Sequence, residues 1–265
     1  MAGTAAINVS VSSHYSEDSY GSETVTQGIL GERVKIIEHH PLFSKIKQAD
    51  GYISWISTDQ LVLDAPPLDN AVQVRSHFIR IREQPAADAP AIRDAVIGTR
   101  LSGDDERNGW TRVILPDGTP GWTESDHFGA FLPATPTLIV ERAREFIGYQ
   151  YTWGGRSPKG FDCSGFIQTI FALHHVQLPR DSWQQQEKHE ISRMFEDALP
   201  GDLLFFARTP ERITHVAVSI GNMRFIHASG WVRYNSLNPS DPDFSASQLD
   251  TFVSVNRYPL PDEQP

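Results

Sequence analysis

Cysteine is nearly absent from this sequence, because Cys163 is the only one among 265 residues. A single cysteine cannot form an intrachain disulfide, so a disulfide-stapled fold is excluded and the redox compartment is left open. Long apolar runs are also missing, and no stretch approaches the roughly 18 residues that a membrane-spanning helix needs. With 39% hydrophobic residues, we expect a protein that packs its own core and has no membrane span.

Positive charge is scarce as well. The 23 Lys and Arg residues face 33 Asp and Glu residues, which gives a net charge of −10 without any basic run. This balance argues against nucleic acid and anionic membranes as partners. The first Lys or Arg is Arg33, so the N-terminus lacks the pattern of a secretory signal, and we expect a cytoplasmic protein. Prior removal of a signal peptide would leave the same sequence, so that alternative stays open.

The first half of the chain contains an internal repeat at a constant offset of 67 positions. The matched positions share their chemistry and pair as follows: Gly31 with Gly98, Val34 with Leu101, Phe43 with Trp110, Lys45 with Arg112, Ile46 with Val113, Asp50 with Asp117, Gly51 with Gly118, Trp55 with Trp122, and Asp59 with Asp126. Asp-Gly between alternating segments predicts a hairpin in each copy. The copies therefore predict two small β-barrels of about 60 residues each, and they resemble tandem bacterial SH3-like domains.

Proline-containing linkers follow each copy, at Ala65-Pro66-Pro67 and at Pro133 to Pro136. Because proline interrupts strands, these linkers predict three domains, at 1–68, 69–132 and 133–265. The third domain begins with helical patterns at 138–147, where Thr137 is the expected N-cap, and at 162–174. It then returns to predicted strands at 202–207, 215–220, 224–228 and 251–257. The expected architecture is multidomain: two β-barrels followed by an α+β domain.

Cys163 lies where a glycine-containing loop enters the second predicted helix of this domain. The helix dipole and the free N–H groups of a first turn favour a thiolate and can hold an oxyanion. A cysteine nucleophile also needs an acid–base partner, usually histidine. The combination predicts covalent catalysis, with a small buried hydrophobic residue as the alternative role for Cys163.

Two histidines, His215 and His227, flank a predicted hairpin turn at 221–223. If all three turn residues are unpaired, Ala217 faces His227 and both histidines point to one face of the sheet. A two-residue turn would place them on opposite faces. In the first register one histidine takes the thiol proton and the other orients it. The adjacent pairs His39-His40 and His174-His175 diverge, so we expect no metal site and no cofactor.

Four segments of the third domain, in order, resemble the NlpC family of papain-like bacterial cell-wall peptidases. They are Tyr151-Thr152-Trp153-Gly154-Gly155, Phe161-Asp162-Cys163-Ser164-Gly165-Phe166, Pro200-Gly201-Asp202-Leu203-Leu204-Phe205-Phe206, and the strand of His215 followed by His227. The resemblance implies a papain-like fold with Cys163 as nucleophile, His215 as acid and base and His227 as the orienting residue. Tyr151 would then line the oxyanion side. The implied substrate is a peptidoglycan stem peptide, cut between γ-D-glutamate and a diamino acid.

A narrower resemblance, to cytoplasmic γ-D-glutamyl-L-diamino acid peptidases, rests on Asp181 and Ser182. In those enzymes the matching residues bind the free amino group of an N-terminal L-Ala. The resemblance also places Ser164, Glu23 and Tyr52 in the substrate site. It implies release of L-Ala-γ-D-Glu from murein peptides during cell-wall recycling. A helix N-cap is the alternative role for Asp181.

Three functional classes remain open from the sequence. The first is the recycling peptidase, and a secreted endopeptidase that acts on intact wall is its close variant. The second is a peptidoglycan-binding module with an inactive third domain, which the intact Cys163, His215 and His227 disfavour. The third is a thiol acyltransferase or amidase, because the same residues serve any acyl-enzyme chemistry. The sequence does not choose between lysine and diaminopimelate as the diamino acid, or set the oligomeric state.

Overall fold

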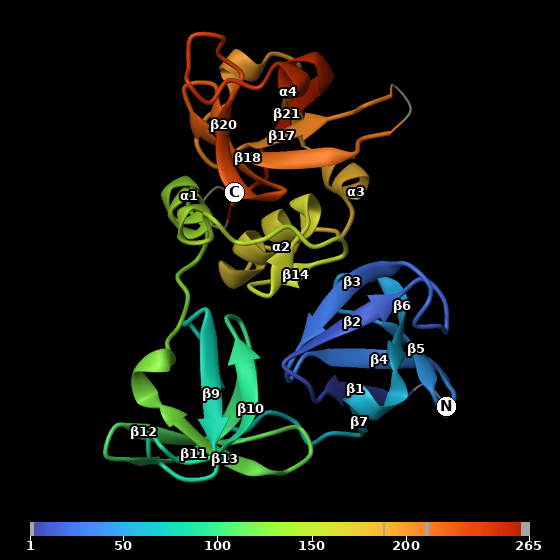
Figure 1. Cartoon of the computed structure of the whole chain (residues 1–265), viewed down its shortest axis with the longest axis vertical. Helices are drawn as coiled ribbons and strands as arrows, with labels where there is room; N and C mark the ends of the chain where they lie inside the picture. Colours follow the sequence, from blue (N-terminus) through green and yellow to red (C-terminus); the bar gives the residue numbers. More distant parts are fainter. Residues whose placement is uncertain (1–2, 188, 210–211, 261–265) are drawn as a thin grey trace. The chain divides into compact units, whose positions relative to one another are not determined.

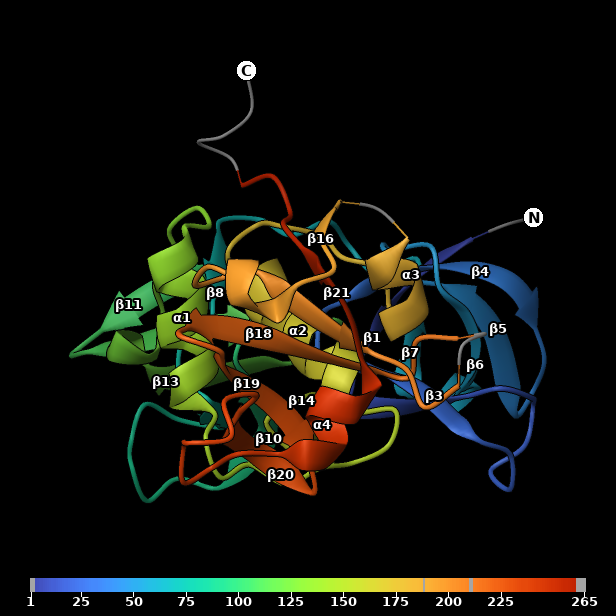
Figure 2. The ribbon, with the colours of Figure 1, turned by 90° about the horizontal axis from the view of Figure 1, so that it is seen from above.

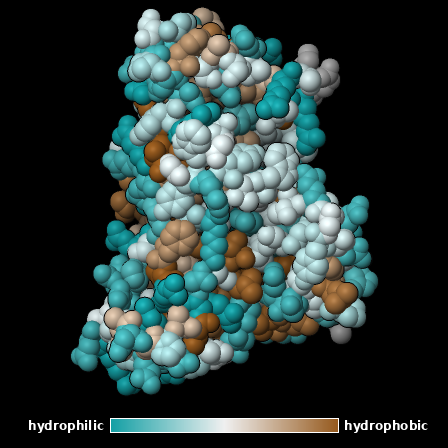
Figure 3. Space-filling view, in the orientation of Figure 1, coloured by the Kyte–Doolittle hydropathy of each residue, from teal (hydrophilic) through white to brown (hydrophobic). Residues whose placement is uncertain are grey.

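The computed structural model describes residues 3–187, 189–209 and 212–260. The chain forms two compact units, Met1–Phe131 and Leu132–Pro265 (Figure 1). Hydrophilic residues cover most of the face drawn in Figure 3, and hydrophobic residues form separate patches on it. No helix in the described ranges is long and apolar enough to span a membrane. The predicted boundaries at 68 and 132 stay predictions, since both repeat copies belong to one unit.

The N-terminal unit consists of two antiparallel sheets of the size expected for SH3-like domains. The first sheet has the strand order β3-β2-β6-β5-β4-β1-β7 and the second has the order β10-β9-β13-β12-β11-β8. The bounds in the first are β1 Thr4–Ile7, β2 Val11–Tyr15, β3 Thr24–Ile29, β4 Arg33–His39, β5 Phe43–Lys47, β6 Ile53–Ser57, the 3₁₀-helix η1 Thr58–Gln60 and β7 Leu61–Leu63. Those in the second are β8 Ala71–Gln73, β9 Phe78–Arg82, β10 Ala91–Val96, β11 Arg100–Arg107, β12 Trp110–Ile114, β13 Pro120–Glu124 and η2 Ser125–His127.

The sequence repeat reappears in the strand pairing. Lys45 pairs with Trp55 in the first sheet, and Arg112 pairs with Trp122 in the second, both shifted by the offset of the repeat. Gly51 and its counterpart Gly118 both have a positive φ, 91° and 85°, because each closes the Asp-Gly turn that precedes the tryptophan strand. The repeat predicted from the sequence is therefore confirmed at the level of register.

The C-terminal unit is an α+β domain with a six-stranded sheet of order β16-β21-β17-β18-β19-β20. Its helices are α1 Pro136–Glu145, α2 Cys163–Leu173, α3 Ser182–Gln186, η3 Phe195–Asp197 and α4 Ala246–Thr251. Its strands are β14 Arg156–Ser157, β15 Gly160–Phe161, β16 Glu190–Ser192, β17 Leu203–Phe206, β18 His215–Gly221, β19 Arg224–Ser229, β20 Trp231–Ser236 and β21 Phe252–Asn256. Helix α2 packs on β18 and β19 (Figures 1 and 2), so the helix that starts at Cys163 lies against the histidine strands.

The start of α1 differs from the sequence prediction. The helix begins at Pro136, and Thr135, not Thr137, is its N-cap, with the Thr135 hydroxyl accepting from the Leu138 N–H at 3.2 Å. Proline is favourable in a first helical turn because its fixed φ suits the helix and its missing N–H would have had no partner there. The proline that was read as part of a linker is thus the first residue of the helix.

Candidate active site

The predicted nucleophile, Cys163, is the first residue of α2, and Asp162 is the N-cap of that helix. The carboxylate of Asp162 accepts hydrogen bonds from the Gly165 N–H at 2.7 Å and from the Gly154 N–H at 3.0 Å. The Asp162 side chain thereby ties the loop before the helix to the first turn. This anchoring fixes the backbone that carries the Cys163 side chain.

Arg180, which the sequence analysis did not single out, completes this anchor. Its guanidinium pairs with both carboxylate oxygens of Asp162, at 3.1 and 2.5 Å, and donates to the Ser164 hydroxyl at 2.9 Å. The Arg180 side chain is 1% exposed. A buried arginine needs a partner of opposite charge, and the bidentate geometry with Asp162 supplies it. Sequence spacing held no signal for a contact between residues so far apart.

The thiol of Cys163 is buried, with 8% of the residue exposed. Burial, together with the nearby Asp162 carboxylate, raises the pKa of Cys163 to about 12, and the Val216 and Ser164 N–H groups and Arg180 lower it only in part. Burial therefore opposes the thiolate that the helix N-terminus is expected to favour. Desolvation outweighs the helix dipole here, so the thiol must lose its proton to a base during attack.

The hairpin that carries the histidines combines a two-residue turn with a bulge that the sequence analysis did not anticipate. Gly221 pairs with Arg224, so the turn contains only Asn222 and Met223, both at positive φ. A two-residue turn alone would separate the histidines, but the register shifts between Ser219 and Gly221. Because of this bulge, Ser219 pairs with Phe225. That register is the one in which Ala217 faces His227 and both histidines point to one face of the sheet.

The two histidines consequently meet on one face of the sheet. Nε2 of His215 lies 2.7 Å from Nδ1 of His227, and Nε2 of His227 lies 2.9 Å from Oδ1 of Asn235. His227 is fully buried. Asn235, on the neighbouring strand β20, was not found from the sequence, because asparagine carries no pattern that distinguishes this role from a surface position.

Burial favours the neutral form of both histidines. Burial lowers the pKa of His215 well below its usual value, and the charges of His227, Arg208 and Arg233 act in the same direction. Burial also lowers the pKa of His227, to about 4, despite the hydrogen bond to Asn235. A neutral imidazole is the form in which His215 can act as a general base.

The buried His227 predicts a loss of stability on acidification. The unfolded chain binds a proton below about pH 6.5, whereas folded His227 does so only near pH 4, so the free energy of unfolding should fall by about 3 kcal/mol across that window. Urea unfolding between pH 4 and 7 measures this slope for the wild type and for His227→Gln. Because the variant lacks the titrating imidazole, its free energy of unfolding should fall less between pH 7 and pH 4 than that of the wild type, by the contribution of about one proton. Parallel curves for the two proteins would refute the assignment of this pH dependence to His227.

Tyr151 and Ser164 lie beside the nucleophile. Burial and the charges of Cys163 and Asp162 raise the pKa of Tyr151, so its phenol keeps its proton and can donate to an oxyanion. The Ser164 hydroxyl donates to Asp162 at 3.3 Å and accepts from Arg180. Tyr151 at the oxyanion and Ser164 in substrate binding stay predictions.

Asp181 and Ser182 begin helix α3. Asp181 is its N-cap in a capping box with Gln184, whose side chain accepts from the Asp181 N–H at 3.2 Å. The alternative role weighed for Asp181 is therefore present in the structure. Burial raises the pKa of its carboxyl group, and Ser182 is 8% exposed. Since Arg180 directly precedes Asp181, the segment that anchors the nucleophile also carries both predicted amine-binding residues.

Glu23 and Tyr52 belong to the N-terminal unit. The backbone carbonyl of Glu23 accepts from the Ser16 N–H, and the N–H of Tyr52 donates to Asp50. These contacts stabilise turns of the first sheet and do not bear on a substrate role. Their place in the substrate site stays a prediction.

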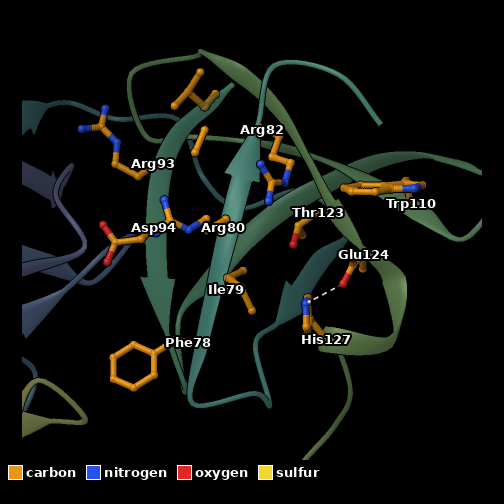
Figure 4. Close-up of a pocket in the computed structure, with 12 residues that line it drawn as sticks. Phe78, Ile79, Arg80, Arg82, Arg93, Asp94, Trp110, Thr123, Glu124 and His127 are labelled. Atoms are coloured by element: carbon orange, nitrogen blue, oxygen red, sulfur yellow. Dashed lines mark ion pairs between the residues drawn. The ribbon is translucent and has the colours of Figure 1, made fainter. Parts of the chain in front are cut away.

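A hollow of about 690 Å³ opens on the second sheet, within the N-terminal unit (Figure 4). Arg80 and Arg82 of β9 and Arg93 of β10 line it together with Trp110. Thr123, Glu124 and His127 also line the hollow, and the single cysteine of the chain does not. Glu124 and His127 form a cluster with Asp126, in which Nε2 of His127 lies 3.1 Å from the Glu124 carboxylate and Nδ1 of His127 lies 2.9 Å from the Ser76 hydroxyl.

Comparison with known proteins places this geometry in a family. Residues 148–247 match the model of the NlpC/P60 family. A γ-D-glutamyl-L-lysine dipeptidyl-peptidase of Bacillus cereus is 29% identical, with 88% of this chain and 74% of the relative aligned. Dipeptidyl-peptidase 6 of Lysinibacillus sphaericus is 26% identical over 91% of this chain and 94% of its own length.

A solved structure shows the same fold over nearly the whole chain. The crystal structure of an NlpC/P60 family protein from Bacillus cereus superposes with a TM-score of 0.81 at 22% identity, covering 97% of this chain and 99% of that one. The predicted architecture, small N-terminal β-domains followed by an α+β catalytic domain, is thereby confirmed. The C-terminal unit of this chain contains an NlpC/P60 domain over residues 148–247, and NlpC/P60 is a family of cysteine peptidases.

Proposed function

We propose that this protein hydrolyses the γ-D-glutamyl-L-diamino acid bond of murein peptides with a free N-terminal L-Ala, releasing L-Ala-γ-D-Glu during cell-wall recycling in the cytoplasm. The observation that carries the proposal is the buried Arg180 bridge, which joins the Cys163 helix to the segment of Asp181 and Ser182. The names of the two long-matching relatives, both dipeptidyl-peptidases, support the same activity.

The geometry suggests how the bond is cut. His215 takes the thiol proton of Cys163 as the sulfur attacks the γ-carbonyl carbon, and the helix-start N–H groups and the Tyr151 phenol face the resulting oxyanion. His215 then passes the proton to the nitrogen of the leaving diamino acid. Water, deprotonated by the same histidine, hydrolyses the thioester and regenerates the thiol.

The selectivity for a free amine rests on Asp181 and Ser182. Burial raises the pKa of Asp181, which means that its carboxylate is poorly solvated and gains from a cationic ligand. An ammonium group offers three N–H donors, whereas an acetylated or glycan-linked terminus offers one and carries no charge. Small murein peptides with a free terminus are therefore favoured over intact wall.

Acetylation of the substrate should reduce turnover strongly. We expect kcat/KM for L-Ala-γ-D-Glu-L-Lys, or its meso-diaminopimelate counterpart, to exceed that of the N-acetyl form by about 100-fold, since a charged hydrogen-bonding partner is lost. Mass spectrometry of the products measures both rates and shows which diamino acid is preferred. Equal cleavage of free and acetylated peptides would refute amine recognition and favour an endopeptidase that acts on intact wall.

Asp181→Asn separates the substrate role from the capping role. Asparagine caps helices about as well as aspartate, so α3 and the stability of the unit should persist while the negative charge disappears. We expect the preference for the free amine to fall to within about tenfold of unity. A variant that keeps the full preference would leave Asp181 with the N-cap role alone.

The same assay discriminates the other classes. If neither peptide is cleaved, the chain is a binding module, and if thioester or amide donors of other kinds react faster, it is an acyltransferase or amidase. A relative named probable endopeptidase p60, from Listeria welshimeri, matches only 36% of this chain, at 38% identity. The proposal follows the relatives that match along most of the chain.

A further inference from the structure

Three polar side chains form a diagonal row across adjacent strands of the catalytic sheet. His215 lies on β18, His227 on β19 and Asn235 on β20, linked by contacts of 2.7 and 2.9 Å. In the ladder, Asn235 faces Phe225 and His227 faces Arg233, so Asn235 and His227 are diagonal neighbours on one face. Asn235 is the last residue of the row, and the reaction steps described above assign no role to its side chain.

The orientation of the Asn235 amide is fixed from its far side. Its Nδ2 donates to the backbone carbonyl of Asp243 at 2.8 Å. A carbonyl oxygen only accepts, so the reversed amide would set two oxygens against each other. The loop that presents this carbonyl is itself held, because the Asp243 carboxylate pairs with Arg224 at 2.7 Å. Oδ1 of Asn235 therefore faces His227, and it can only accept.

This acceptor determines the tautomers of both histidines. Because Oδ1 accepts, Nε2 of His227 carries the proton and Nδ1 of His227 keeps its lone pair. That lone pair faces Nε2 of His215, so Nε2 of His215 carries a proton too. We infer that Asn235 is a positioning residue that fixes this order of donors and thereby makes Nδ1 of His215 the basic nitrogen that receives the thiol proton.

The consequence for catalysis is a defined proton path. The proton of the Cys163 thiol moves to Nδ1 of His215 as the sulfur–carbon bond forms, and the imidazolium shares its Nε2 proton with Nδ1 of His227. The Val216 N–H, adjacent to His215, faces the Cys163 sulfur, which places this strand beside the thiol. The inference rests on the catalytic roles proposed for these residues and not on the identity of the peptide.

Nitrogen NMR tests the inference without substrate. Long-range ¹H–¹⁵N spectra of the wild type at pH 7 should show both active-site histidines protonated on Nε2, and His227→Gln assigns the two sets of signals. Asn235→Ala should turn His227 into a mixture of tautomers. A proton on Nδ1 of either histidine in the wild type would overturn the inference, whether or not murein peptides are cleaved.

Kinetics with the peptide substrate give the second readout. Asn235→Ala should lower kcat by about 10- to 100-fold with KM little changed, the size of effect that follows loss of a histidine's hydrogen-bonding partner. Asn235→Asp keeps an acceptor toward His227 but adds a negative charge and sets an oxygen against the Asp243 carbonyl, so it should lose some stability, preserve the tautomers and move the acid limb of the kcat/KM profile to higher pH. If Asn235→Ala fails to fold, the nitrogen spectrum of the wild type and the pH profile of Asn235→Asp still test the positioning role of Asn235. An unchanged pH profile and unchanged tautomers in these variants would refute the positioning role.

Discussion

Replacing Cys163 by alanine is expected to lower peptide hydrolysis by about 10⁴- to 10⁶-fold, the range known for loss of a catalytic nucleophile. The reason is that the Cys163 thiol is the proposed acyl-enzyme nucleophile, whereas the hydroxyl of the neighbouring Ser164 is held by Asp162 and Arg180. Because alanine differs from cysteine by one sulfur atom and the cap of the helix is Asp162, the free energy of unfolding should change by only about 1 kcal/mol. Progress curves and urea unfolding measure the two effects separately.

Chemical labelling provides an independent control for the same residue. Since the chain contains one cysteine, iodoacetamide can add a single group, and that addition should abolish activity in proportion to the modified fraction. The pKa of about 12 predicts slow labelling at pH 7 that accelerates steadily as the pH rises. Fully labelled protein that still hydrolyses the peptide, or an active Cys163→Ala, would show that another residue carries the reaction.

The sequence predicted those parts of the site that local patterns encode. Cys163 stood at a helix start and the histidines bracketed a hairpin, so type and spacing sufficed to bring the three together as candidates. The repeat was equally accessible, because a constant offset preserves the tryptophan register in both sheets. In each case the information lay within one element or in one fixed distance along the chain.

Other parts of the site depend on tertiary contacts and could not be predicted. The bulge between Ser219 and Gly221 decides the face on which His215 points, yet Gly221, which suits a bulge, suits a turn position equally well. Desolvation reversed the expected pKa direction of Cys163, because burial depends on the packed domain. Asn235 gains its role only through a strand that pairs beside His227.

Arg180 is the second residue for which we expect a large effect, on stability. Arg180→Met should lower the free energy of unfolding by about 3–5 kcal/mol, because it leaves the Asp162 carboxylate buried without its counter-charge. Asp162→Asn is the matched variant, since asparagine retains the helix cap while removing the charge. In the double variant no charge of the pair remains, so the losses should fall short of additive by about 1–3 kcal/mol.

Thiol reactivity distinguishes this pair from a purely structural ion pair. The Asp162 carboxylate raises the pKa of Cys163, and Arg180 lowers it. Asp162→Asn should therefore speed the alkylation of Cys163 near neutral pH, whereas Arg180→Met should slow it, although both variants lose stability. Additive stability losses, or alkylation rates that change in the same direction, would show that the pair does not set the electrostatic environment of the nucleophile. If the two alkylation rates change in opposite directions, the Arg180–Asp162 ion pair has two roles. It stabilises the start of α2, and Arg180 partly offsets the effect of the Asp162 carboxylate on the Cys163 thiol.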